Sequence, residues 1–97
     1  MLAEARSRIR RYTPDEARVD TELLLVDTRF ADEREHDGVI PGSRYVPLSV
    51  LPWQADDLAE RRVCLVCAPG YSSSLAAALL LEPGVDAGDL IGGYEAW

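Results

Sequence analysis

Apolar runs alternate along this chain with polar segments that carry glycine, proline and small side chains. Two continuous apolar runs, within residues 22–29 and 61–67, are typical of strands buried on both faces of a parallel sheet. Shorter strands are predicted at residues 44–46 and just before the Gly-Gly pair near the end of the chain. Helices are predicted over residues 2–11, 14–18, 31–38 and 73–82. Two further short helices are predicted, one after a loop within residues 49–60 and one after the Gly-Gly pair. Because strands and helices alternate, the pattern predicts an α/β fold with a mostly parallel sheet.

Two of the predicted helices carry recognisable end signals. Thr13 is a suitable N-cap, Pro14 suits the first helical position, and Glu16 completes a capping box. Gly38 is the expected C-cap of the polar helix that precedes it.

Composition indicates one globular domain over residues 1–97. Hydrophobic residues make up 47% of the chain and charged residues 28%. Ten Lys+Arg against 17 Asp+Glu give a net charge of −7, which argues against nucleic acid or an anionic membrane as partner. The basic cluster at residues 6–11 is therefore interpreted as a solvated helix face.

The start of the chain is charged and lacks the apolar region of a signal peptide. No apolar run approaches the roughly 18–20 residues that a membrane span needs. We therefore expect a cytoplasmic protein, in which thiols stay reduced and the two cysteines are not presumed to be bridged.

Cys67 is the strongest candidate for chemistry. It stands at the carboxyl end of a predicted strand and just before a helix, the edge at which parallel α/β sheets bind ligands. Residues 68–72 can curl around the sulfur with inward-pointing amides, helped by Gly70 and Pro69. The positive end of the helix that begins near Ser73 also favours a thiolate, the nucleophilic form. A structural cysteine in a turn remains the alternative at this point.

Cys64 and Cys67 match the C-x-x-C spacing of redox and zinc sites. Three residues apart on a strand, their side chains lie on opposite faces and cannot share a disulfide or a metal. Cys64 is expected in the core and His36 on the surface, and neither a metal nor a cofactor is expected.

Four segments in order resemble the rhodanese-like sulfurtransferase family. They are LLLVDTR at 23–29, GVIPGS at 38–43, VCLVCAPGYSSSLAAALL at 63–80 and IGGYEAW at 91–97. Residues 1–20 resemble the N-terminal helical extension of some bacterial members. The resemblance implies a five-stranded parallel sheet flanked by helices.

The resemblance also implies a mechanism in which Cys67 takes a sulfur from a small-molecule donor, such as thiosulfate or a persulfide. The Cys67 persulfide would then pass that sulfur to a thiophilic acceptor, such as a sulfur-acceptor protein. The residues expected to bind the substrate are Ala68, Pro69, Gly70, Tyr71, Ser72, Ser73 and Arg29.

The length of the loop separates the branches of this family. From Cys67 to Ser72 the loop is C-x4-S, whereas the related phosphatases need C-x5-R and here Ser73 takes the place of that arginine. Phosphatase activity is therefore disfavoured. The loop contains no cation, which favours a low-charge persulfide donor or a protein partner over thiosulfate.

Several neighbouring residues have two possible roles. Arg29 either attracts an anionic donor or pairs with Glu33 or Asp32. Asp27 is expected to tie down loop backbone, and Tyr71 either lines the mouth of the pocket or covers the loop.

Near the end of the chain, Gly92 and Gly93 are expected to let the following loop pass near the active site. Trp53 and Trp97 are expected to be packing residues.

Two functional classes follow. The first is a single-domain sulfurtransferase with Cys67 as the persulfide carrier, and the second is a non-catalytic rhodanese-like interaction or regulatory module. A thiol redox sensor is a third possibility. The cysteine at the strand–helix junction favours the enzyme, whereas the missing loop cation favours the module.

Overall fold

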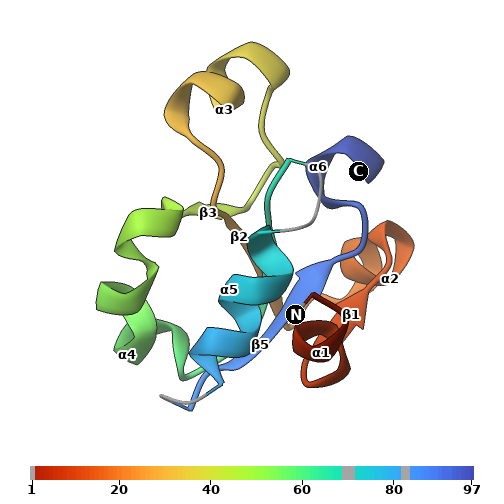
Figure 1. The fold of residues 1–97 in the computed structure, drawn as a ribbon. Coiled ribbons are helices and arrows are strands. Elements are labelled where there is room, and N and C mark those ends of the chain that lie inside the picture. The colour runs from red at the N-terminus through yellow and green to blue at the C-terminus, as the bar shows by residue number, and fades with distance from the viewer. Residues whose placement is uncertain (1, 69–71, 82–83) are drawn as a thin grey trace.

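A computed structural model describes residues 2–68, 72–81 and 84–97 of the 97-residue chain. Its centre is a five-stranded sheet in the order β1-β5-β4-β2-β3, and every pair of neighbouring strands is parallel (Figure 1). The strands are β1 Arg10–Tyr12, β2 Leu23–Asp27, β3 Arg44–Tyr45, β4 Arg62–Val66 and β5 Asp86–Leu90. The predicted α/β fold with a parallel sheet flanked by helices is confirmed.

The helices are α1 Leu2–Ser7, α2 Pro14–Val19, α3 Ala31–Asp37, the 3₁₀ helix η1 Leu48–Gln54, α4 Ala55–Leu58, α5 Ser72–Leu80 and α6 Gly93–Ala96. The predicted capping box at the start of α2 is present, since Thr13 and Glu16 exchange hydrogen bonds of 2.9 and 3.2 Å. Gly38 ends α3 as predicted, with a φ of +90° and its N–H donated to the Arg34 carbonyl. In the described part of the chain, no helix is long and apolar enough to cross a membrane.

The sheet separates two apolar clusters. One packs η1, α4 and α5 against one face, and the other packs α2 and α6 against the opposite face. Successive residues of β4 alternate between them, so Val63 and Leu65 belong to the first cluster and Cys64 and Val66 to the second. Helix α3 contributes no buried residue to either cluster and projects from the top of the molecule in Figure 1.

The helix expected over residues 2–11 is wrong beyond Ser7. Residues 10–12 form β1, which pairs in parallel with β5 at the edge of the sheet. Gly88 makes this pairing possible, because a Cβ there would lie 2.2 Å from the Arg10 carbonyl oxygen. The helical extension expected over residues 1–20 thus contains a strand that completes the sheet.

We expected the basic cluster at residues 6–11 to be a solvated helix face, but only part of it is. Arg11 forms an ion pair of 2.9 Å with Asp89, whose side chain is fully buried. The Arg6 guanidinium donates a hydrogen bond of 3.1 Å to the Ser74 hydroxyl. Half of this basic segment therefore ties β1 and α1 to the rest of the fold.

The two tryptophans differ in their surroundings. Trp97 packs against the second apolar cluster, and the Arg18 guanidinium lies 4.5 Å from its ring centre. The expectation that Trp53 is a packing residue is wrong, because it is 84% exposed. It follows Pro52 within a 3₁₀ helix whose buried side is occupied by Leu51.

Candidate active site

A hollow of about 220 Å³ opens where β2 and β4 end. The two strands are parallel neighbours, so their carboxyl ends meet at the same edge of the sheet. The segment after β2, the start of α5 and the residue after β4 all reach this hollow. Its lining residues are Thr28, Arg29, Phe30, Glu33, Leu48, Cys67, Ala68 and Ser72.

Cys67 lines this hollow and is only 5% exposed, so most of the residue is covered by its surroundings. The thiol donates to the Ser73 hydroxyl at 3.2 Å, and the Ser73 backbone N–H points to the sulfur at 3.4 Å. Both contacts come from the first turn of α5. A negative charge on the sulfur would therefore face an amide, a hydroxyl and the positive end of a helix.

The other predicted loop residues have different positions. Ala68 and Ser72 line the hollow beside Cys67. Pro69, Gly70 and Tyr71 lie outside the described residues.

The start of the loop is held by the beginning of α6. Gly92 and Gly93 have φ of +79° and +63°, which lets the chain turn back toward the loop. The Tyr94 N–H then donates to the Cys67 carbonyl at 2.7 Å, and the Glu95 N–H donates to the Ala68 carbonyl at 3.1 Å. The expectation that the Gly-Gly turn brings the next segment near this site is confirmed.

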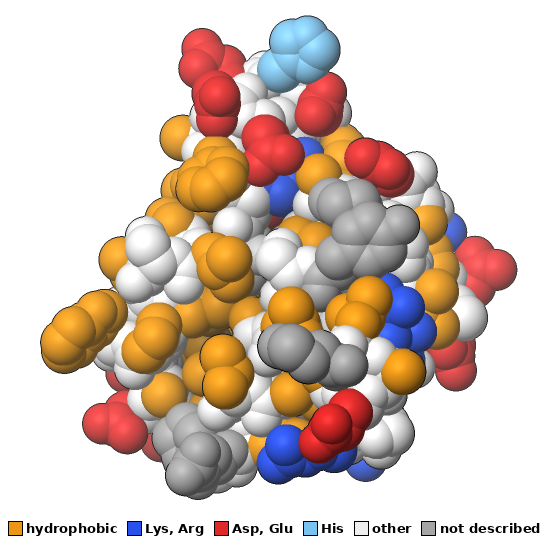
Figure 2. All heavy atoms as spheres, in the orientation of Figure 1, with side chains coloured by type: hydrophobic (Ala, Val, Ile, Leu, Met, Phe, Trp, Pro, Cys, Tyr) orange, Lys and Arg blue, Asp and Glu red, His pale blue; other side chains and the backbone are white. Residues whose placement is uncertain are grey.

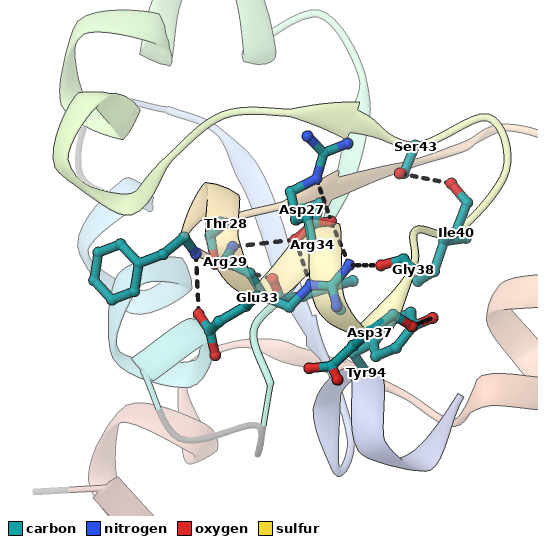
Figure 3. A network of polar contacts seen from close by, with 12 residues as sticks. Asp27, Thr28, Arg29, Glu33, Arg34, Asp37, Gly38, Ile40, Ser43 and Tyr94 are labelled. Carbon is teal, nitrogen blue, oxygen red and sulfur yellow. Dashed lines mark hydrogen bonds and ion pairs between the residues drawn. The ribbon is translucent and has the colours of Figure 1, made fainter.

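Arg29 lies at the centre of a polar network beside the hollow (Figure 3). Its guanidinium makes hydrogen bonds of 3.0 and 2.9 Å to the two Asp27 carboxylate oxygens and one of 2.7 Å to the Gly38 carbonyl. The carbon of the guanidinium also lies 3.8 Å from the centre of the Tyr94 ring. The pairing with Glu33 or Asp32 that we had considered is wrong, because Asp27 is the ion-pair partner.

Asp27 holds both backbone and side chains. One carboxylate oxygen accepts the Arg29 N–H at 3.1 Å, which confirms the role expected from the sequence, and the other accepts from Arg34 at 3.0 Å. Burial raises the pKa of Asp27, but the hydrogen bonds from Arg29 and Arg34 outweigh it and hold the pKa below its usual value. The same hydrogen bond with Asp27 raises the pKa of Arg29.

The Arg29 guanidinium is not fully used by this network. Within the part of the chain that the structure describes, its Nη1 atom is buried and has no hydrogen-bond partner. Because a buried donor without a partner is costly, a hydrogen-bond acceptor that reached this atom would be bound favourably.

Cys64 lies in the core, as predicted, and is fully buried on the face opposite to η1 and α5. Burial, with a smaller effect of nearby Asp89, raises the pKa of its thiol well above the ordinary value. Neither of the two cysteines, both of which the structure describes, forms a disulfide. His36 is on the surface as predicted, and its hydrogen bond to Asp37 raises its pKa.

A second buried network fixes α5 beneath the site. The Ser74 hydroxyl donates to Asp89 at 2.6 Å, and Asp89 is also held by Arg11 from β1. Ser74 and Asp89 are both fully buried. The network therefore anchors the first turn of α5, which carries Ser73, to the two strands at one side of the sheet.

Sequence reasoning missed four of the residues that line the hollow. Thr28 and Phe30 flank the predicted Arg29, so their position after the strand was a usable signal. Glu33 and Leu48 reach the hollow only through the way α3 and η1 pack, and nothing in their local sequence indicated it.

Comparisons with known proteins agree with this architecture. The family model described as "Rhodanese-like domain" matches residues 12–97. No curated protein matches the chain significantly.

Among solved structures, a rhodanese homologue from Thermus thermophilus is 32% identical, with a TM-score of 0.72 over 91% of this chain and 100% of its own. A rhodanese-like domain protein from Staphylococcus aureus is 26% identical, with a TM-score of 0.82 over 92% and 91%. A protein of unknown function from Rhodopseudomonas palustris, described as a possible tyrosine phosphatase, is 29% identical, with a TM-score of 0.89 over 99% and 84%.

The family match begins within β1 and continues to the last residue, so it includes all the elements that surround Cys67. This chain belongs to the rhodanese-like domain family.

Proposed function

We propose that this protein is a sulfurtransferase that moves a sulfane sulfur from thiosulfate or a persulfide donor to a thiophilic acceptor through a persulfide on Cys67. We place the reaction in the cytoplasm, where both thiols stay reduced. The observation that carries the proposal is that Cys67 lines the hollow while the amide and the hydroxyl of Ser73 contact its sulfur.

The reaction has two displacements. In the first, the Cys67 thiolate attacks the outer sulfur of the donor. The rest of the donor leaves with the electron pair of the broken S–S bond, as sulfite or a thiolate. In the second, cyanide or an acceptor thiolate attacks the outer sulfur of the persulfide and releases the Cys67 thiolate. No external oxidant is needed, because each S–S bond that breaks is replaced by another bond to the transferred sulfur.

The surroundings of the sulfur support the first step. The Ser73 N–H, the Ser73 hydroxyl and the end of α5 stabilise negative charge on Cys67 and on the terminal sulfur of its persulfide. We propose that the backbone amides of residues 68–73 hold the persulfide. Of these amides, the one of Ser73 has a described contact with the sulfur.

The charges around the hollow bear on the donor. Arg29 offers the unpaired Nη1 to an anion, whereas the Glu33 carboxylate lines the same hollow and opposes one. With a net charge of −7 for the whole chain, the balance favours a persulfide of low charge over thiosulfate.

Phosphatase activity is a second candidate because of the description of the Rhodopseudomonas palustris relative. The sixth position after Cys67, which would carry the phosphate-binding arginine, holds Ser73. The Ser73 hydroxyl accepts a hydrogen bond from the Cys67 thiol. We therefore expect no hydrolysis of p-nitrophenyl phosphate, and measurable hydrolysis that Cys67→Ser abolishes would replace the sulfurtransferase proposal.

Intact mass spectrometry tests the proposal directly. After incubation with thiosulfate or with glutathione persulfide, the protein should gain the mass of one sulfur atom. Cys67→Ser should abolish the gain, and Cys64→Ser should retain it as the matched control. Cyanide should then remove the sulfur and yield thiocyanate, whereas absence of an adduct from either donor would favour the non-catalytic interaction module.

A further inference from the structure

A second hollow, of about 500 Å³, runs along the outer side of α5 and is lined almost entirely by apolar side chains. We call it the α5 groove. Its volume is within the range of roughly 300–1,000 Å³ that ligand pockets have. The lining residues are Leu48, Leu51, Pro52, Ala55, Ser72, Leu75, Ala76, Leu79 and Leu80.

Both walls of the α5 groove are helical stripes. On α5, the residues that line the groove are spaced i, i+3, i+4, i+7 and i+8 from Ser72 to Leu80. On the opposite wall, the lining residues are spaced i, i+3, i+4 and i+7 from Leu48 to Ala55. At 1.5 Å per residue, the α5 wall is about 12 Å long. This shape is a channel between two helices, and such channels accept a third helix that presents matching apolar anchors.

The α5 groove is continuous with the hollow that holds Cys67. Leu48 and Ser72 line both of them. Ser72 is also the residue next to Ser73, which contacts the Cys67 sulfur. A segment lying in the groove would therefore have one end beside the proposed persulfide.

Large apolar side chains in and beside the α5 groove are exposed to solvent. Leu79 is 74% exposed, Leu75 is 37% exposed, and Trp53 beside Pro52 is 84% exposed. Figure 2 shows hydrophobic side chains gathered over η1, α4 and α5 on this face of the molecule. Exposed apolar patches of this kind mark interaction surfaces, and aromatic residues such as tryptophan are frequent binding anchors.

Charge indicates what kind of partner would fit. Among the described residues, none that lines the α5 groove is charged. Acidic residues outnumber basic ones near the wall that ends in α4, because Asp56, Asp57 and Glu60 are exposed there and line a neighbouring hollow whose single cation, among the described residues, is Arg44. Glu33 lines the hollow beside Cys67. Glu4 of α1 and Arg8, which follows that helix, offset each other near Leu79.

We propose that the α5 groove docks an amphipathic helix of a sulfur-acceptor protein, with leucine-like anchors in the groove and Lys or Arg on its flanks. The docked helix presents a cysteine to the hollow at its end. Its thiolate attacks the outer sulfur of the Cys67 persulfide, the Cys67 thiolate leaves with the bonding pair, and the acceptor cysteine becomes the persulfide. This inference rests on the proposed sulfur transfer, because it names the acceptor of that reaction.

Synthetic peptides test the inference. The probe is a helical peptide with leucines at i, i+3, i+4 and i+7, lysines elsewhere and a terminal cysteine. A scrambled peptide of the same composition and an analogue with glutamates in place of the lysines serve as controls. From persulfidated protein, we expect transfer to the ordered basic peptide to be at least tenfold faster than to either control.

A pair of protein variants shows where the peptide binds. Leu79→Glu should remove the advantage of the ordered peptide and leave the rate with cyanide unchanged. Val19→Glu is the matched control, since Val19 is 79% exposed on α2, outside the groove, and should retain the advantage. Circular dichroism melting verifies that both variants are folded.

Each other result contradicts the inference in a distinct way. Equal rates for the ordered and scrambled peptides would exclude helix docking. A concentration-dependent dimer, seen by sedimentation and lost in Leu79→Glu, would assign the groove to a second copy of this chain. Octanethiol matching the rate of the ordered peptide would assign it to small apolar acceptors.

Failure of sulfur transfer itself is distinguishable. If no donor forms a persulfide, the proposed enzyme function fails, and binding of a fluorescent form of each peptide becomes the readout. Binding that depends on the leucine order and is lost in Leu79→Glu would keep the groove as the docking surface of a non-catalytic module. Binding that ignores the order would overturn the groove assignment as well.

Discussion

The backbone N–H of Tyr94 donates a 2.7 Å hydrogen bond to the carbonyl oxygen of Cys67. The same tyrosine places its ring 3.8 Å from the Arg29 guanidinium carbon, so one residue of α6 contacts both strand ends that form the hollow. Helix α6 thus holds the backbone of Cys67, while α5 supplies the groups that contact the sulfur itself.

The two thiols should react at very different rates. Cys67 borders the hollow and contacts Ser73, whereas Cys64 is fully buried and burial raises the pKa of its thiol. We expect iodoacetamide to modify Cys67 in the folded protein and Cys64 only after unfolding, as followed by peptide mapping. Equal modification of both under native conditions would contradict this description of the site.

Ser73→Ala should slow alkylation of Cys67 by about tenfold or more at neutral pH. The variant removes the hydroxyl that lies 3.2 Å from the sulfur, and a hydrogen bond to a charged group contributes about 1.5–3 kcal/mol. Ser72→Ala is the matched control, because that neighbouring side chain is exposed and should change the rate little. Similar rates for all three proteins would show that the hydroxyl does not stabilise the thiolate.

Asp27→Asn should lower the free energy of unfolding by about 3–5 kcal/mol, because it leaves the buried Arg29 without its ion-pair partner. Urea denaturation measures this loss. Asp32→Asn, on the exposed side of α3, is the control and should change stability only slightly. A loss below 1 kcal/mol in Asp27→Asn would mean that the network has little structural weight.

The contribution of Asp27 should disappear in acid. Its pKa in the folded protein is below the ordinary value of 3.8, so the carboxylate stabilises the fold at higher pH and this stability is lost as pH falls through the folded pKa. The difference in free energy of unfolding between wild type and Asp27→Asn should therefore shrink as pH decreases below about 3.8. A difference independent of pH would assign the effect to packing.

Gly88→Ala should detach β1 from the sheet. Its added Cβ would lie 2.2 Å from the Arg10 carbonyl oxygen and 2.8 Å from the Tyr12 ring, and such overpacking costs about 1–3 kcal/mol. Hydrogen exchange should show faster exchange at β1 amides, with the pairing of β2 and β4 unaffected. Uniformly faster exchange throughout the sheet would instead indicate a global loss of stability.

Some of the site could be predicted because its signals are local. The apolar runs located β2 and β4, and the cysteine at the end of one run located the reactive position at a strand–helix junction. Gly92 and Gly93 indicated a sharp turn, which brings Tyr94 to Cys67. These features follow from backbone preference and burial within a few residues.

Other parts of the site could not be predicted because they depend on side-chain packing. Arg29 was expected to pair with Glu33 or Asp32 of the following helix or to attract a donor, yet it is held by Asp27, Gly38 and the Tyr94 ring. The anchoring of α5 through Ser74 and Asp89 likewise joins residues that the sequence keeps apart.

The sequence by itself determined the order of strands and helices after residue 12, the helix caps and the place of Cys67 before a helix. Only the tertiary structure decided that residues 10–12 join the sheet, that Asp27 neutralises Arg29, and that an apolar groove meets the hollow beside Cys67. The physical reason is that backbone conformation and burial are encoded in neighbouring residues. Which side chains meet, and which apolar surface remains uncovered, depends on how distant elements pack.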